Sequence, residues 1–154
     1  MSEVIFRPAI LEDLETLKGF EQGIIKAERP FNSTLKEGDI SYYDLGELIK
    51  AEDAEVIVGT IDNEVVCSAS VIIRDAKPYF KHEKYAYLGF MFVKPEFRGR
   101  GINKGIIAEL KNWAKAHGIT ETRLTVYTEN EAAIKAYEKA GFEKLIVEMR
   151  LGLD

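Results

Sequence analysis

The sequence predicts an α/β fold built on a mixed β-sheet, and three observations lead to that prediction. An apolar run over residues 87–93 enters a glycine-rich turn and then a stretch with helical periodicity. Strand-like and helix-like segments then alternate through the second half of the chain, which requires at least one parallel pair of strands. In the first half, two β-rich runs flank Asp62-Asn63, which is typical of an antiparallel hairpin.

Periodicity and turn residues define the elements of the first half. Apolar residues recur at helical spacing from Leu14 to Ile24, and Pro30 ends the pattern. Ser41 followed by Asp44 resembles a capping box with Asp in place of Glu, which predicts a short second helix. The predicted elements are a strand over 4–6, a helix over about 11–27, a helix ending near residue 50, and strands over 55–61 and 65–73.

The second half is more regular. A loop over 74–84 precedes the central strand, which ends at Val93. Glycines mark the ends of both following helices, because Gly118 and Gly141 suit the position after a helix. The predicted elements are a helix over about 102–117, a strand over 123–127, a helix over 131–140 and a last strand over about 144–151.

The bulk composition predicts a globular chain that folds without a structural metal or disulfide bonds. Its 154 residues fit one domain over 1–154, with 46% hydrophobic and 31% charged residues. The single cysteine, Cys67, excludes an internal disulfide and a cysteine-based zinc site, and only two histidines are present. We therefore expect no metal, and we expect Cys67 to pack in the core.

Charge and hydropathy also limit the partners and the location. The formal net charge of −5 argues against general nucleic-acid binding. The N-terminus lacks the basic region and apolar run of a signal peptide, and no apolar stretch approaches the ~18 residues that span a bilayer. We expect no membrane partner and a cytoplasmic location.

The turn after the central strand combines basic residues with glycines. Between Val93 and Gly105 it carries four basic side chains and one acidic side chain, although the whole chain is acidic. Glycines allow a ligand to approach the backbone closely. The unpaired N–H groups at the start of a helix bind anions. The segment therefore predicts a phosphate site.

Two motifs resemble signatures of the GCN5-related N-acetyltransferase (GNAT) family. Arg98-Gly-Arg-Gly101-Ile-Asn103 is similar to the acetyl-CoA-binding pattern [Arg/Gln]-x-x-Gly-x-[Gly/Ala], except that Asn103 stands where Gly or Ala is usual. The segment from Asn130 to Phe142 resembles the downstream pattern Asn-x-x-Ala-x-x-x-Tyr-x-x-x-Gly-Phe. The resemblance covers essentially the whole chain and implies an acyl-CoA N-acyltransferase fold whose two parallel strands splay apart.

The resemblance implies that acetyl-CoA is the co-substrate. The pyrophosphate would bind the backbone at the start of the helix, and the pantetheine arm would pair with Met91 and Val93 in the manner of an added strand. The Met91 N–H would stabilise the oxyanion of a tetrahedral intermediate. The implied cofactor-binding residues are Met91, Val93, Arg98, Gly99, Arg100, Gly101, Ile102, Asn103, Lys104, Asn130, Ala133 and Tyr137.

The resemblance also implies direct acetyl transfer to an amine, with Tyr137 as the general acid that protonates the departing thiolate. Many relatives carry a basic carboxylate on the central strand, but the aligned position here is Tyr87. A water-relayed base is therefore expected, and Glu83, His82 and Glu28 are its candidates. The predicted catalytic set is Tyr137, Glu83 and Tyr87.

The acceptor is predicted from charge and from aromatic residues. Glu28, Phe31, Tyr42 and Tyr79 are the candidate substrate-binding residues, and the acidic chain favours a cationic small-molecule amine. A protein or peptide amine remains an alternative acceptor, and a non-catalytic acyl-CoA sensor remains an alternative function. A homodimer is possible.

A dinucleotide-binding oxidoreductase is a competing interpretation. Gly99 and Gly101 resemble the start of G-x-G-x-x-G, but Gly105 comes one position late. Five residues also separate the strand from the first glycine. The spacing therefore favours the acetyltransferase.

Overall fold

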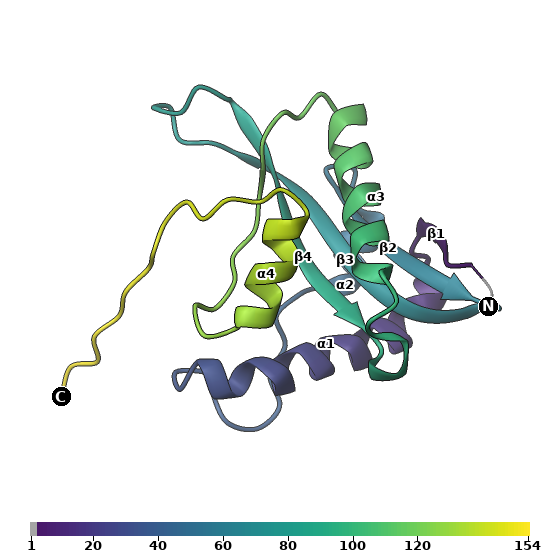
Figure 1. Ribbon diagram of the computed structural model, residues 1–154, viewed down its shortest axis with the longest axis horizontal. Helices are drawn as coiled ribbons and strands as arrows, with labels where there is room; N and C mark the ends of the chain where they lie inside the picture. The colour runs from purple at the N-terminus through teal and green to yellow at the C-terminus, as the bar shows by residue number, and fades with distance from the viewer. Residues whose placement is uncertain (1–2) are drawn as a thin grey trace.

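The computed structural model describes residues 3–154 and contains a five-stranded mixed sheet in the order β1-β2-β3-β4-β5 (Figure 1). All neighbouring strands are antiparallel except β4 and β5, which are parallel. The mixed sheet predicted from the sequence is confirmed. The strands are β1 (Ile5–Pro8), β2 (Ala54–Ile61), β3 (Glu64–Asp75), β4 (Lys84–Val93) and β5 (Thr122–Arg123).

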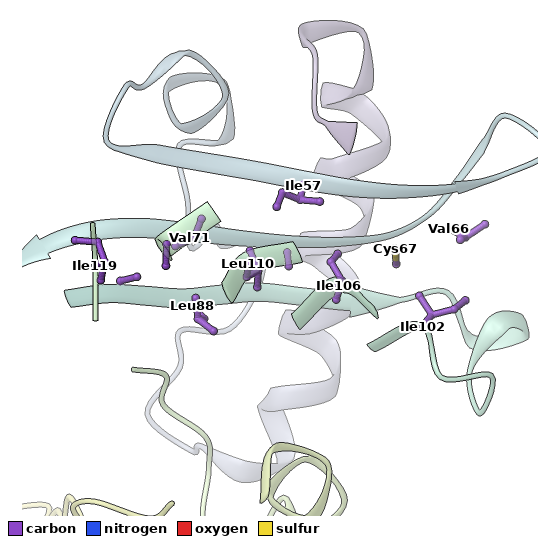
Figure 2. Close-up of a cluster of buried hydrophobic side chains, with 12 residues drawn as sticks. Ile57, Val66, Cys67, Val71, Leu88, Ile102, Ile106, Leu110 and Ile119 are labelled. Atoms are coloured by element: carbon purple, nitrogen blue, oxygen red, sulfur yellow. The ribbon is translucent and has the colours of Figure 1, made fainter. Parts of the chain in front are cut away.

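Helices cover both faces of this sheet. On one face, α3 packs against β2, β3 and β4 around a core that includes Leu88, Ile106 and Leu110 (Figure 2). On the other face, Leu17 and Phe20 of α1 join Phe90 in a second core. The α-helices are α1 (Leu14–Glu28), α2 (Leu45–Lys50), α3 (Ile102–Ala116) and α4 (Glu131–Lys139).

Two predictions about individual residues are confirmed. Asp62 and Asn63 both have positive φ, 50° and 67°, as the tight turn of a β2–β3 hairpin requires. Cys67 is fully buried in the α3-side core (Figure 2). Burial raises the pKa of its thiol to about 11, so the thiol stays protonated at neutral pH.

Several predicted boundaries were wrong by a turn or less. A 3₁₀ turn over Leu11–Asp13 precedes α1, so the predicted helix from residue 11 begins as two elements. The N-cap of α2 is Asp44, whose carboxylate accepts a hydrogen bond from the Glu47 N–H, and Ser41 is not part of the cap. The first strand begins one residue later than predicted and continues through Pro8.

The predicted last strand, over residues 144–151, is not formed. This segment has no sheet pairing among the described residues, and it leaves the body of the molecule as an extended arm (Figure 1). The strand predicted over 123–127 is also shorter, because β5 pairs with β4 only at Thr122 and Arg123. Alternating apolar residues predict a strand, but a strand also needs a neighbouring edge with which to pair.

Candidate active site

The loop that joins β4 to α3 leaves backbone N–H groups open at the start of the helix. Gly99 and Gly101 both have φ of 78°, a left-handed conformation that glycine adopts without strain. A Cβ atom at either glycine would meet no atom within 4 Å, so the loop is open on that side. Gly101 is the N-cap of α3 and has no side chain to cap the first turn. The loop therefore has the free donors and the open approach that an anion needs.

The two arginines of this loop are exposed and held against the end of β4. Arg98 donates through Nε to the Val93 carbonyl at 2.9 Å. Arg100 donates through Nη2 to the Glu96 carbonyl at 3.2 Å, and its guanidinium lies over the Phe97 ring. These bonds fix the side chains near the mouth of the loop and keep their positive charges in solvent. The third glycine, Gly105, has a different role, because the Phe6 ring packs where its Cβ would be.

A β-bulge interrupts β4 at Phe90. The register with β3 shifts between Ser68 and Ser70, and Phe90 adopts φ of 52°, which is strained for a residue with a bulky side chain. Side chains satisfy both of its backbone groups: Phe90 N–H donates to the Tyr43 hydroxyl at 3.2 Å, and Ser68 donates to the Phe90 carbonyl at 3.1 Å. Strain held in this way marks functional sites.

The bulge also changes which residues face each side of the sheet. Leu88 lies in the α3-side core, whereas Phe90 lies in the core formed with α1. Met91, the next residue, packs partly against the α3 side. The bulge therefore resets the orientation of the β4 backbone at Met91, the residue expected to face the thioester.

Beyond the bulge, β4 has an unpaired edge. Its ladder with β5 begins at Ala86 and ends at Tyr87, so the stretch from Leu88 to Val93 has no β5 neighbour. This is the splay between parallel strands that the family resemblance implied. The open edge leads along β4 toward the loop that starts α3 (Figure 1). The Val93 carbonyl on this stretch already accepts from Arg98.

Tyrosines gather around one carboxylate beside this edge. Glu28, the last residue of α1, is half-buried, and burial raises its pKa. Burial raises the pKa of Tyr137, and the negative charge of Glu28 raises it further. Burial likewise raises the pKa of Tyr43, to about 12, with Glu28 adding to the shift. Phenols in this set therefore remain protonated through neutral pH.

Tyr42 is the most unusual member of this group. Burial raises the pKa of its phenol, and the neighbouring Glu28 carboxylate raises it further. Its hydroxyl is buried beside the Glu28 carboxylate and has no other hydrogen-bond partner in the described part of the chain. A buried hydroxyl next to a half-buried carboxylate is a pair of groups that a polar ligand group could join.

Sequence reasoning missed the residue that positions these tyrosines. Glu21 is 3% exposed, and its Oε2 accepts from the backbone N–H groups of Tyr42 and Tyr43, each at 2.8 Å. It therefore fastens the segment before α2 to the side of α1. An acidic residue at an apolar position of a helix stripe, between Leu17 and Ile25, is the signal that points to such a role.

A hollow of about 500 Å³ lies on the α2 side of the sheet next to these residues. Tyr42, Tyr43, Tyr87 and Gly89 line it. Its charged side chains are of both signs: Asp44, Glu47, Asp53, Lys50 and Arg74. It lies beside the bulge, since Gly89 immediately precedes Phe90. Its size suits a small molecule.

Other predicted residues take varied positions. Tyr87 donates to or accepts from the Thr125 hydroxyl at 2.7 Å and so bridges β4 to the segment after β5. The Phe31 ring lies 6.0 Å from that of Tyr127. Asn130 caps α4, with Oδ1 accepting from the Ala133 N–H at 3.3 Å.

Three candidates lie at the other end of β4. Tyr79, His82 and Glu83 belong to the β3–β4 loop, which is far from the loop that starts α3 (Figure 1). Tyr79 is 79% exposed and contacts Phe80. At about 3.3 Å per residue, Glu83 is roughly 25 Å from Met91 along the strand. The structure does not bring these residues together with the Tyr137 group.

Comparisons with known proteins agree with this geometry. Structures with the same arrangement include a mutant of a Bacillus halodurans protein, with 21% identity, a TM-score of 0.87, and 97% of this chain and 99% of that one covered. A predicted acetyltransferase from Clostridium acetobutylicum, solved with acetyl-CoA, has 21% identity, a TM-score of 0.77 and coverages of 97% and 96%. The aminoglycoside N-acetyltransferase AAC(6')-Iy has 21% identity, a TM-score of 0.73 and coverages of 97% and 100%. These likenesses show the acyltransferase fold.

The family model for the acetyltransferase (GNAT) family matches residues 22–142. The chain belongs to this family. An acetyltransferase of Pectobacterium atrosepticum is 38% identical over 65 residues, which are 42% of this chain and 45% of that protein. An N-acetyltransferase of Methanocaldococcus jannaschii is 43% identical over 54 residues, 35% of this chain and 24% of that protein. The chain thus matches less than half the length of these curated relatives.

Across residues 3–154, no group of three or more His, Cys, Asp or Glu side chains is placed to hold a metal ion. No helix in that range has the length and apolar character to cross a membrane.

Proposed function

We propose that this chain is an acetyl-CoA-dependent N-acetyltransferase that acetylates the primary amine of a cationic small molecule. One observation supports this most strongly. The unpaired edge of β4 runs from the tyrosine group around Glu28 to the open N–H groups at the start of α3. Acetyl-CoA carries its thioester at one end of the long pantetheine arm and its pyrophosphate at the other. It therefore needs two such sites with a strand edge between them.

At the phosphate end, binding would depend on the backbone. The N–H groups of residues 100–104 would hold the pyrophosphate, and Arg98 and Arg100 would add positive charge at the mouth. Met91 and Val93 would pair with the pantetheine arm, while Asn130 and Ala133 at the start of α4 would border it from the β5 side. Asn103 has its backbone N–H in the same first turn, so its replacement of Gly or Ala leaves that donor in place.

At the reacting end, side chains would move protons and Met91 would stabilise charge. The acceptor nitrogen, in its neutral form, would attack the thioester carbonyl carbon, and the Met91 N–H would donate to the oxygen as it becomes negative. The C–S bond would then break, and Tyr137 would give its proton to the leaving thiolate. The extra proton on the nitrogen would leave through water to a base.

Glu28 is the strongest candidate for that base and for the anchor of the acceptor. It is half-buried beside the buried hydroxyl of Tyr42, which has no other hydrogen-bond partner among the described residues. Its raised pKa brings it closer to neutrality, where a general base is more effective. Tyr87 would help to shape the hollow. Phe31, whose ring lies next to that of Tyr127 and outside the hollow, would contact the acceptor from the loop after α1.

The cationic acceptor is supported by charge. The hollow has three acidic side chains, Asp44, Glu47 and Asp53, against two basic ones, Lys50 and Arg74. AAC(6')-Iy, named as an aminoglycoside N-acetyltransferase, has the same fold. Release of free thiol from acetyl-CoA in the presence of a panel of amines tests the proposal. We expect turnover with cationic small amines. If the protein binds coenzyme A but releases no thiol with any small amine or peptide, the chain is an acyl-CoA sensor and the proposed enzymatic activity is wrong.

A further inference from the structure

One side of the hollow is lined by an arginine, Arg74 of β3. Ser70, Ile72 and Arg74 alternate along this strand, and all three line the hollow. The Arg74 guanidinium lies over the Tyr87 ring, 4.0 Å from the ring centroid. Through its side chain it makes no ion pair and no hydrogen bond with the described part of the chain. The N–H donors of its planar fork are therefore free to bind a ligand.

The Tyr87 ring beneath this guanidinium is held in place. Tyr87 belongs to the stretch of β4 that pairs with both β3 and β5. Its hydroxyl shares a hydrogen bond with the Thr125 hydroxyl at 2.7 Å. An arginine stacked on a fixed ring loses less side-chain freedom when it binds a ligand, because the ring already restricts it. Arg74 is thus a preorganised cation and not a freely moving surface charge.

Tyr87 also lies close to the reacting end of the proposed site. Burial, followed by the charges of Glu28 and Tyr87, raises the pKa of Tyr137, so these groups are neighbours. Tyr42, whose hydroxyl is buried beside Glu28, lines the hollow as well. A small molecule in the hollow can therefore contact Arg74 at one end and the tyrosine group around Glu28 at the other.

We propose that the amine acceptor also carries a carboxylate, and that the Arg74 guanidinium binds this carboxylate. The inference rests on the proposed function, since it names the class of acceptor for the same site. Arginine binds a carboxylate through two parallel N–H···O bonds, which fix the orientation of the ligand as well as its position. The acceptor would lie across the Tyr87 ring, with its carboxylate at Arg74 and its reacting amine toward Glu28. Amino acids carry this pair of groups.

The remaining charges of the hollow favour a basic amino acid. Its acidic side chains outnumber the two basic ones, Lys50 and Arg74. A phosphate ester, with a charge of about −1.5 to −2 at neutral pH, would be repelled by the acidic side chains more strongly than a singly charged carboxylate. A second ammonium group on the acceptor would be attracted to them. An acceptor with two amines and one carboxylate matches both signs of charge and is still a cationic small molecule.

A matched pair of acceptors isolates the contribution of the carboxylate. Cadaverine has the same carbon chain and the same two amines as L-lysine, and it lacks only the carboxylate. In steady-state kinetics with acetyl-CoA, kcat/KM for L-lysine should be about tenfold or more above that for cadaverine. Arg74→Gln should remove this preference, because its KM for L-lysine should rise about 10–100-fold while kcat changes little.

Two further variants separate the planar fork from its charge. Lys50→Gln removes a positive charge from the same hollow and should keep the preference for L-lysine, because the carboxylate is assigned to Arg74 alone. Arg74→Lys keeps the charge without the fork, so it should retain part of the preference. Both positions are exposed, so all three variants should keep the circular dichroism spectrum of the wild type. A wild type that does not prefer L-lysine, or equal losses in Arg74→Gln and Lys50→Gln, would overturn the proposal.

A second pair, O-phosphoethanolamine and ethanolamine, tests a phosphate in place of the carboxylate. If the preference within this pair is the larger one and depends on Arg74, the bound anion is a phosphate and the carboxylate assignment is wrong. Calorimetry with coenzyme A present tests Arg74 apart from catalysis: wild type should bind L-lysine more tightly than cadaverine, and Arg74→Gln should not. If L-lysine binds in this way without being acetylated, the carboxylate site is supported and the proposed enzymatic activity is wrong. If amines are acetylated with no dependence on Arg74, the activity is supported and the carboxylate site is wrong.

Discussion

The two ends of the unpaired β4 edge are built in opposite ways. At the end where α3 begins, the donors are backbone N–H groups, and glycines with φ of 78° leave them open. At the other end, around the Phe90 bulge, the polar groups are side chains from α1, the segment before α2, and α4. Backbone sites tolerate many side chains but not a change of backbone conformation, whereas the tyrosine end depends on single functional groups.

The largest effect is expected at the tyrosine end. Tyr137→Phe removes the proposed proton donor and keeps the ring, so kcat should fall by roughly 10²–10⁴-fold while the affinity for coenzyme A changes little. Steady-state kinetics and calorimetry separate the two effects. The control Tyr85→Phe removes a phenol that lies outside the site and should leave kcat unchanged. Equal kcat in Tyr137→Phe and wild type would remove Tyr137 from the mechanism.

The next effect is expected at the backbone end. Gly101→Ala forces an L-residue to adopt φ of 78°, which costs about 1–2 kcal/mol and shifts the loop. We expect the dissociation constant for coenzyme A to rise about tenfold, since 1.4 kcal/mol corresponds to that factor. Gly19→Ala is the matched control, because it adds a methyl group where no atom lies within 4 Å. Tight binding by Gly101→Ala would show that the loop is not the phosphate site.

A smaller effect should follow from the charge of Glu28. Its pKa is raised, so as the pH falls Glu28 becomes protonated, and loses its negative charge, at a higher pH than an ordinary glutamate does. The KM for a cationic acceptor should therefore rise in acid, and Glu28→Gln should raise KM several-fold and abolish that pH dependence.

Stability provides a second test of the same residue. A half-buried charge with a raised pKa destabilises the fold when ionised, so Glu28→Gln should raise the melting temperature at neutral pH and not in acid. The exposed control Glu12→Gln should change neither quantity. If Glu28→Gln leaves KM unchanged across the pH range, a residue other than Glu28 binds the acceptor.

The smallest effect on chemistry is expected from Glu21, which holds the tyrosines through their backbone. Glu21→Ala leaves the Tyr42 and Tyr43 N–H groups without their acceptor, which should cost about 2 kcal/mol or more of the free energy of unfolding. Chemical denaturation measures this. Glu15→Ala is the control, since the Glu15 side chain is 89% exposed. Equal stability of the two variants would contradict the anchoring role.

The contrast between the two ends explains which part of the candidate site could be predicted from the sequence alone. The backbone end lies in one continuous stretch, from Arg98 to Lys104, so spacing and composition were enough to predict a phosphate site there. The tyrosine end joins Glu28, Tyr42 and Tyr137, which are far apart in the sequence, and only the fold shows that they meet. Glu83 looked suitable because it precedes the central strand, but the length of that strand separates it from Met91.

The sheet shows the same limit. Hairpin and helix signals are local, and they predicted β2, β3 and α3 closely. The arm over 143–154 has the alternation of a strand, but pairing is decided by the edge available, which no local pattern reports. The bulge at Phe90 was likewise invisible, because its partners Ser68 and Tyr43 come from other segments.

The central claim is that backbone N–H groups at the start of α3 hold the pyrophosphate of coenzyme A. Isothermal titration calorimetry of the folded full chain with coenzyme A tests it most directly. The account predicts one site per chain, with affinity lost on removal of the pyrophosphate portion and weakened in Gly101→Ala. No heat with coenzyme A or acetyl-CoA, from protein with a native circular dichroism spectrum, would contradict it.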